Sequence, residues 1–349
     1  MSSRIILISC GKKKLDHKTE AENLYISPLF KYNLRYAKSL KSDKIFILST
    51  EYGLVGLKQK IEPYDLTLNR MPSANIQKWA NQVVKKLSKV ADLKKDEFTF
   101  LAGQRYRQYL IPKINNYKVP LEGLGIGKQL GYLKNKVANE EKCGQLHKYF
   151  NNLKRLKFPF LDQDIPKNGI YVLFEKKELA HEGNRIVRVG THTGLNQLRS
   201  RLKQHFIQEN KDRSIFRKNI GRCFLNKQKD SFLEKWELDL TAKKDKEKNS
   251  QLIDFKKQKK IEQKVSKYIQ NNFSFVVFLI ENKKERLALE SKIISTISLC
   301  NECQPSKNWF GFNSPKEKIK KSGLWLVNEL YKEPLSDKEL KDLRNKYEN

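Results

Sequence analysis

The sequence predicts an α/β protein of two domains. We expect an N-terminal three-layer α/β domain with a mostly parallel sheet, followed by a C-terminal α+β domain with a small antiparallel central sheet. In the first third of the chain, short apolar runs alternate with helical segments, which is the pattern of a parallel sheet. In the second half, the apolar runs Gly169–Glu175 and Arg185–Val189 are close enough to pair directly. A length of 349 residues fits two domains.

The N-terminal elements follow from hydrophobic periodicity. Arg4–Ser9 is a continuous apolar run, typical of a parallel strand covered on both faces. Apolar residues recur every three or four positions through Ile76, Trp79 and Val83, which predicts a helix over Pro72–Ala91. The other elements expected here are helices over Pro28–Lys41 and Tyr106–Asn115 and strands over Lys44–Ser49, Asp96–Ala102 and Val119–Leu121.

The domain boundary is marked by helix-breaking residues. Glu140–Leu156 is polar and helical, and Pro159, Pro166 and Gly169 then interrupt the pattern. We therefore expect a first domain over 1–138, a linker helix over 139–166, a second domain over 167–335 and a charged helical tail over 336–349. Within the second domain we expect helices over Leu195–Gln208 and Arg286–Leu299, a buried central strand over Phe273–Ile280 and a solvated insertion over Thr241–Lys264.

The net charge favours a polyanionic partner. The chain has 71 Lys and Arg against 39 Asp and Glu, a formal charge of +32. Such a field attracts nucleic acid, although a lysine-rich solvated surface explains part of the excess. No apolar stretch approaches the length of a membrane span, and we expect the short apolar start to be a buried first strand, since it lacks the length and order of a signal peptide. We expect a soluble cytoplasmic protein that binds DNA and no membrane.

Two glycine-containing strand motifs precede a set of polar residues. Gly169-Ile170-Tyr171 lies on one predicted strand, and Arg188-Val189-Gly190 ends the next. Arg201 and His205 are four residues apart and share one helix face, and Glu290 lies on a later helix. This order resembles that of the GIY-YIG nucleases over roughly residues 140–331, and the Arg-to-His spacing is similar to that of the family's restriction enzymes.

The resemblance implies a role for each residue. Glu290 would hold one Mg²⁺ or Mn²⁺ ion, and Arg201 would grip the phosphate through its planar fork. Tyr171 would orient or deprotonate the attacking water. Because a phenol ionises far above neutrality, it needs help, and His205 is the expected helper. Asn308 would supply the family's final polar residue. Each residue alone has an ordinary structural explanation, and only the set in order predicts a nuclease.

The chain departs from the family pattern at the second motif. Arg188 stands where the family has an aromatic residue, and the loop Lys176–Asn184 is longer than usual. A bacterial subfamily that resembles this chain shares its RVGTH sequence and the SIFRxxxG pattern at Ser214–Gly221, so we expect Thr191-His192 on the rim of the site. Our hypothesis is that Arg188 replaces the missing phenol and favours the phenolate form of Tyr171.

The N-terminal half contains the motifs ISCGKKK at Ile8–Lys14, ILSTEYGLV at Ile47–Val55 and EPYDLTL at Glu62–Leu68. In these motifs it resembles an uncharacterised bacterial and archaeal family and, more distantly, a uracil-DNA-glycosylase-like domain. Ligand crevices in open α/β sheets lie beyond the strand C-termini, and aromatic residues can stack a flipped base. The candidate pocket residues are Ser9, Cys10, Lys13, Ser49, Tyr52, Tyr64 and Asp65. Tight-turn packing with solvated lysines is the alternative.

Five cysteines show no disulfide framework. Cys300 and Cys303 have the spacing of a zinc-ligand pair, but the sequence has no second pair and the histidine nearest to them in the chain is His205. The pattern by itself therefore does not favour a structural zinc site.

The function predicted is a metal-dependent DNA endonuclease. Its N-terminal domain would recognise or excise modified bases, in restriction of invading DNA or in repair. Two alternatives stay open: a non-catalytic base sensor that gates the nuclease, and a nucleic-acid-binding protein with an inactive nuclease fold. The oligomeric state is also open, with a homodimer as one option.

Overall fold

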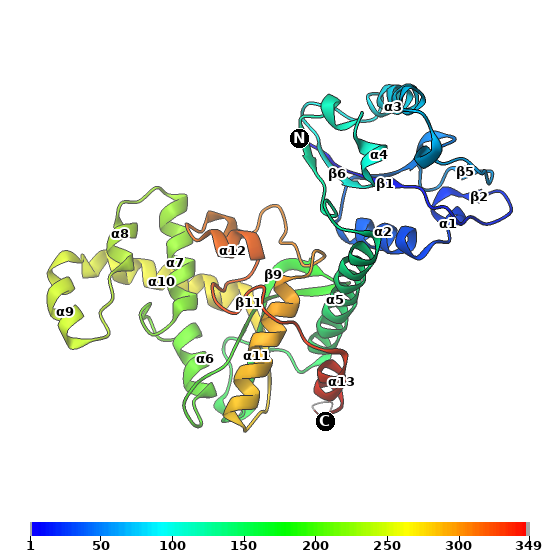
Figure 1. The fold of residues 1–349 in the computed structure, drawn as a ribbon. Helices are drawn as coiled ribbons and strands as arrows, with labels where there is room; N and C mark the ends of the chain where they lie inside the picture. Colours follow the sequence, from blue (N-terminus) through cyan, green and yellow to red (C-terminus); the bar gives the residue numbers. More distant parts are fainter. Residues whose placement is uncertain (1, 347–349) are drawn as a thin grey trace. The chain divides into compact units, whose positions relative to one another are not determined.

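The structure is a computed structural model that describes residues 2–346. It divides into two compact units, residues 1–140 and 141–349, and each unit is described by itself. Figure 1 shows the elements of both units. No helix among the described residues is long and apolar enough to cross a membrane.

The first unit contains a five-stranded sheet in the order β4-β3-β1-β6-β7. Strand β1 (Arg4–Ser9) pairs in parallel with both β3 (Lys44–Ser49) and β6 (Glu97–Leu101). Strand β7 (Asn116–Lys118) also pairs in parallel, whereas β4 (Gly53–Gly56) is antiparallel. The mostly parallel sheet that the sequence predicts is therefore confirmed.

The two faces of β1 lie against different helices. Ile6 and Ile8 share a core with residues of α2 (Pro28–Ser39), whereas Ile5 and Leu7 share a second core with residues of α3 (Ser73–Leu87). This arrangement confirms the three-layer architecture. The smaller elements are α1 (Ala21–Leu24), η1 (Leu68–Arg70) and the pair β2 (Thr19–Glu20) and β5 (Lys60–Ile61).

Two elements differ from prediction because of prolines. The helix expected over Tyr106–Asn115 is instead a short α4 (Gln104–Arg107) followed by the 3₁₀ turn η2 (Ile111–Lys113). Pro112 has no N–H to bond the Gln108 carbonyl and its ring would clash with that carbonyl, so one continuous helix cannot run through it. The strand expected over Val119–Leu121 lies earlier, at β7, because Pro120 has no N–H for the ladder.

The second unit contains a four-stranded antiparallel sheet in the order β10-β9-β11-β8. The long strand β9 (Ile170–Ala180) pairs with β10 (Gly183–Gly190) on one side and β11 (Phe273–Phe278) on the other. The small antiparallel central sheet is therefore confirmed. Strand β8 (Leu156–Lys157) lies at one edge, within the segment expected to be only a linker helix.

Alternate residues of β9 point to opposite cores. Ile170 and Val172 pack with residues of α11 (Lys283–Ser298), and Tyr171 and Leu173 pack with residues of α6 (Leu198–Phe206) and α7 (Ile215–Lys227). The long helix α5 (Ile126–Asn152) contributes Leu146 and Phe150 to the first of these cores. Tyr171 is therefore placed in the core to which α6 and α7 contribute.

Two charged segments contribute to the core. The insertion expected to be solvated contains the exposed α9 (Lys243–Asn249) and the start of α10 (Phe255–Asn272), which buries Ile261 within the insertion and Val265 and Ile269 just beyond it. In the tail, α13 (Asp337–Lys346) buries Leu340 and Leu343. Apolar residues at helical spacing give both helices a buried face. The remaining elements are α8 (Phe232–Glu237), α12 (Glu317–Ser322), η3 (Asp162–Asp164), η4 (Ser250–Leu252) and η5 (Phe310–Asn313).

Candidate active site

Tyr171 lies at the centre of a buried hydrogen-bonded group. Its hydroxyl is 2.7 Å from Nε2 of His205, and Nε of Arg188 donates to the same oxygen at 3.3 Å. Tyr171 and His205 have no exposed surface, and Arg188 is 4% exposed. Strands β9 and β10 and helix α6 thus bring together three residues that the sequence predicts as site residues.

The glycines of both strand motifs allow close approach. Gly190 pairs with Tyr171 across the two strands, and a Cβ at residue 190 would lie 2.2 Å from the Tyr171 hydroxyl. A Cβ at Gly169 would lie 2.2 Å from the carbonyl oxygen of Phe278 on β11. Neither contact is sterically possible, so any other residue would displace the phenol or part the strands.

His205 is held in a neutral state. Burial, together with the charges of Arg201, Arg188 and Arg217, lowers the pKa of His205 well below its usual value. Its Nδ1 lies 2.7 Å from Oγ of Ser214, the N-cap of α7. A neutral imidazole whose Nδ1–H bonds Ser214 presents the Nε2 lone pair to the phenol proton.

The SIFRxxxG segment, Ser214–Gly221, holds His205 in position through hydrogen bonds. Ser214 accepts a hydrogen bond from the Arg217 amide at 3.2 Å, and Arg217 donates to the His205 carbonyl at 3.1 Å. Arg217 also forms a buried ion pair of 2.6 Å with Glu262 on α10. At Gly221, an added Cβ would lie 2.2 Å from the ring of Trp236. The motif therefore fixes the imidazole and packs α7.

Arg188 interacts with both the phenol and Glu290. Its Nη1 donates to the carbonyl of Trp325, which anchors the side chain. Burial raises the pKa of Glu290 to about 7, while Arg188, a hydrogen bond from the Thr191 amide and Arg201 favour the ionised form. A partly buried carboxylate in this state gains from a bound cation. One carboxylate with water ligands is a coordination that Mg²⁺ accepts, so the residues fit such an ion.

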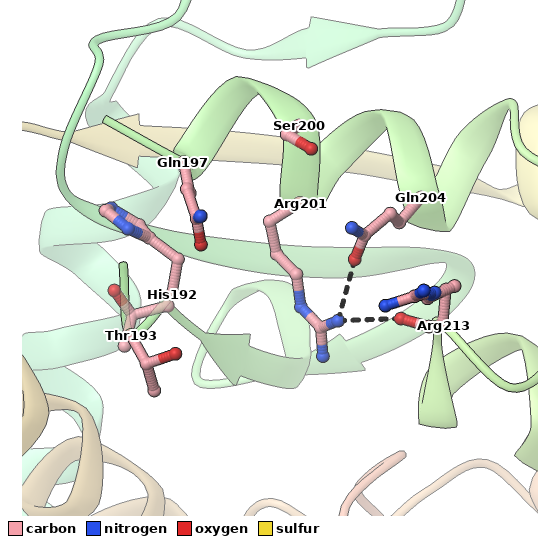
Figure 2. A pocket seen from close by; sticks show the side chains of 8 residues that line it. His192, Thr193, Gln197, Ser200, Arg201, Gln204 and Arg213 are labelled. Carbon is pink, nitrogen blue, oxygen red and sulfur yellow. Dashed lines mark hydrogen bonds between the residues drawn. The ribbon is translucent and has the colours of Figure 1, made fainter. Parts of the chain in front are cut away.

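A cavity of about 400 Å³ lies beside this group. Figure 2 shows Arg201 extending from α6 into it, with His192 and Thr193 on one side and Arg213 on the other. Nη1 of Arg201 donates to Oε1 of Gln204 at 3.0 Å and to the Arg213 carbonyl at 2.9 Å. A guanidinium has five N–H donors, so three remain for an anion. Thr191 and His192 line the cavity, in agreement with the rim expected from the sequence.

Asn308 does not join this group. It is exposed and does not line the cavity. Its neighbour Trp309 instead donates its indole N–H to Glu175 at 2.7 Å. Sequence reasoning missed Gln204 and Arg213 as cavity residues and Ser214 as the partner of His205. Gln204 could have been found, because it lies three residues after Arg201 and therefore on the same face of the predicted helix.

In the first unit, several predicted residues meet around Tyr64. Its hydroxyl accepts a hydrogen bond from Ser49 at 2.8 Å and lies 2.9 Å from the hydroxyl of Tyr25. The rings of Tyr52 and Tyr64 meet edge to face with centroids 5.6 Å apart. Lys14, and not the predicted Lys13, lies over the Tyr64 ring at 4.2 Å.

A second cluster surrounds Cys10. Its Sγ lies 3.2 Å from the Tyr106 hydroxyl and 3.4 Å from Oγ1 of Thr50. Burial, with the nearby Cys10 thiol, raises the pKa of Tyr64 and Tyr106 well above that of a free phenol, so both hydroxyls stay neutral. Lys13 and Asp65 are exposed, and Ser9 is half-buried at the end of β1.

Comparisons with known proteins match both halves of the chain. A family model described as "GIY-YIG domain" matches residues 138–349, and a family of unknown function matches residues 5–135. No curated protein and no solved structure gave a significant match. Because the first model covers more than half of the chain, the protein belongs to the GIY-YIG family. The C-terminal half is therefore a nuclease domain, which makes the protein an enzyme with DNA as its substrate.

Proposed function

We propose that the C-terminal unit is a metal-dependent DNA endonuclease whose site consists of Tyr171, Arg188, Arg201, His205 and Glu290. The observation that carries the proposal is the hydrogen-bonded group of His205, Tyr171 and Arg188, whose charge also acts on Glu290, beside a cavity lined by Arg201. These residues come from β9, β10, α6 and α11.

The cavity residues provide the phosphate subsite. Arg201 and Arg213 line the cavity, and the three further N–H donors of Arg201 can bind phosphate oxygens. Glu290 would hold the divalent ion, Mg²⁺ or Mn²⁺, which when bound would supply positive charge that stabilises the five-coordinate phosphorus and the leaving oxygen. Burial raises the pKa of Glu290, and the charge of Arg188 partly opposes this effect, so it favours the ionised carboxylate that would bind the metal.

Proton transfer would run from Tyr171 to His205. The neutral Nε2 of His205 accepts the phenol proton across 2.7 Å, and the Arg188 guanidinium stabilises the phenolate oxygen at 3.3 Å. The phenolate then accepts a proton from the attacking water. This scheme gives Arg188 the place of the family's second aromatic residue.

One movement is required for this scheme. The phenol has no exposed surface, so water reaches its oxygen only when a covering side chain shifts. Arg188 donates to the hydroxyl and its charge acts on Glu290, so the scheme requires it to stay beside the phenol oxygen. We propose that DNA binding shifts other side chains around the hydroxyl and admits one water, while Arg188 keeps its hydrogen bond.

A plasmid-nicking assay tests the proposal. The full chain should convert supercoiled plasmid to nicked or linear DNA when Mg²⁺ or Mn²⁺ is present, and Glu290→Ala should abolish the conversion. Modified and unmodified plasmids are compared under the same conditions. If wild-type and Glu290→Ala proteins were equally inactive on every plasmid while both bound DNA, the alternative of an inactive nuclease fold would replace the proposal.

We further propose that the N-terminal unit recognises an altered base and directs the nuclease to it. Support comes from the neutral phenols of Tyr64 and Tyr106 near Cys10, and from Lys14 over the Tyr64 ring, which together offer donors, a stacking surface and a cation. Release of a free base by Glu290→Ala protein would establish excision, and cleavage confined to modified DNA without base release would establish a sensor. Restriction of modified invading DNA and repair both fit this scheme.

A further inference from the structure

Four possible metal ligands converge in the second unit, away from the residues assigned to catalysis. They are Cys143 on α5, His181 in the turn between β9 and β10, and Cys300 and Cys303 after α11. One ligand atom from each lies within 4.8 Å of all the others. We propose that these four residues bind one structural Zn²⁺ ion.

The separations match a tetrahedral zinc. Sγ of Cys143 lies 3.3 Å from Sγ of Cys303, and Nε2 of His181 lies 3.3 Å from Sγ of Cys300. Zinc bonds of about 2.0–2.3 Å place neighbouring ligand atoms about 3.3–3.8 Å apart. The ligands therefore need only a small contraction to close around the ion.

His181 is oriented as a ligand. Its Nε2 points to the thiols, whereas its Nδ1 lies 3.3 Å from a carboxylate oxygen of Glu302. A carboxylate on the second nitrogen fixes the tautomer that leaves the first nitrogen free to bind metal, as in many zinc sites. Glu302 lies between the two cysteines of the Cys300–Cys303 pair, so one short segment supplies two ligands and this partner.

The hairpin that carries His181 is strained without a metal bond. His181 and Glu182 form a two-residue turn with φ of 49° and 61°, and Ala180 pairs with Gly183 across it. Such turns strongly prefer Asn and Gly, because other residues pay a steric penalty at positive φ. A bond from His181 to zinc would offset this penalty and accounts for a histidine at that position.

A second histidine nearby is excluded as a ligand. His147 is fully buried, and its ring centroid lies 4.8 Å from that of His181. Its Nε2 accepts the Ile186 amide at 3.1 Å, so its Nδ1–H donates to the Cys143 carbonyl at 2.9 Å. Both nitrogens are engaged by the backbone. The ligand set therefore stays at three thiols and one imidazole.

The donor set selects the ion and its role. Three sulfur atoms and one nitrogen suit Zn²⁺, whereas Mg²⁺ and Ca²⁺ require oxygen. Binding releases the three thiol protons and leaves a complex of charge −1. Four protein ligands leave no position for water, which is typical of a structural site. The ion would join α5, the β9–β10 hairpin and the end of α11, the helix that carries Glu290.

Metal analysis of the full chain tests the proposal. Protein purified under reducing conditions should contain about one zinc per chain, and Cys143→Ser and Cys303→Ser should reduce this to less than about a tenth. Cys223→Ser is the matched control, because Cys223 is also buried in this unit but outside the cluster. It should keep its zinc, and so should His181→Cys, which supplies a fourth thiolate.

Two measurements keep the test independent of folding defects and of the catalytic ion. When the thiols of the wild-type protein are titrated with an organomercurial, zinc should be released in proportion to the thiols that have reacted. A chromogenic chelator detects the released zinc. Glu290→Gln should lose cleavage and keep zinc. The proposal is wrong if wild-type protein incubated with zinc under reducing conditions holds none or holds iron instead, if Cys303→Ser retains full zinc, or if mass spectrometry finds a disulfide among these cysteines.

Discussion

The hydroxyl of Tyr171 and Nε2 of His205 are 2.7 Å apart in a region with no solvent exposure. The burial that hides the pair also keeps the imidazole neutral, because a charged ring would lose hydration there and would face Arg201, Arg188 and Arg217. The two side chains therefore form a neutral hydrogen-bonded pair, and His205 would accept the phenol proton only as the attacking water gives its own proton to the phenol oxygen. Four predictions test this and the neighbouring features.

Tyr171→Phe and His205→Ala should each reduce plasmid cleavage by about 10²–10⁴-fold, because each removes one end of the proton transfer. The double variant should be little worse than either single variant, since the two residues act as a unit. Single-turnover rates at saturating Mg²⁺ measure the effect, and thermal melting checks that the variants fold. Fully multiplicative losses would show that the two residues act separately.

Arg201→Lys should lower cleavage by at least about tenfold, because lysine keeps the charge but lacks the planar fork that binds two phosphate oxygens. DNA affinity without divalent metal should change by less than about threefold, since much of it comes from total charge. Lys203→Ala is the control on the same helix, because Lys203 is 40% exposed and pairs with Asp162. Equal effects from Arg201→Lys and Lys203→Ala would contradict the assignment.

Gly190→Ala should displace the Tyr171 phenol, because the new methyl group would lie 2.2 Å from its hydroxyl. We expect a loss of cleavage on the order of 10²-fold and a destabilisation of about 1–3 kcal/mol from overpacking. Gly131→Ala is the matched control, since nothing lies within 4 Å of a Cβ there. Cleavage rates and melting temperatures of both variants are compared. Full activity in Gly190→Ala would contradict the claim that a methyl group at this position displaces the Tyr171 phenol.

Glu290→Gln should stabilise the metal-free protein more at pH 8 than at pH 5. Burial raises the pKa of Glu290 from 4.5 to about 7, so folding favours the protonated carboxyl. That stabilisation is complete below about pH 4.5 and is lost as pH rises through 7. Glutamine resembles the protonated form at every pH, so its advantage should grow by about 1–3 kcal/mol across this window.

Urea denaturation in buffer free of divalent ions measures that difference. Glu247→Gln, at an exposed position on α9, is the control and should shift stability equally at both pH values. A constant effect of Glu290→Gln between pH 5 and 8 would mean that the carboxyl titrates as it does in the unfolded chain.

The elements of both sheets were predictable because their signals are local. Arg4–Ser9 and Lys44–Ser49 are strands with the predicted bounds. A short, continuous apolar run between helices is typical of a parallel strand that is buried on both faces. The order of Tyr171, Arg201, His205 and Glu290 was equally visible, because motif spacing is a property of the chain. The prediction failed where proline changed the backbone, at Pro112 and Pro120, and at the edge strands β4 and β8, which are too short to give a periodic signal.

The sequence by itself thus determined the central strands of the two larger sheets, the glycine motifs and the residue types of the catalytic set. Tertiary structure alone decided that Tyr171 is buried and hydrogen-bonded to Arg188, that Glu290 has a raised pKa, and that Cys143 lies beside Cys303 although 160 residues separate them. The physical reason is that dielectric environment and ligand geometry depend on which distant segments pack together. Helix and strand periodicity, by contrast, depends only on neighbours along the chain.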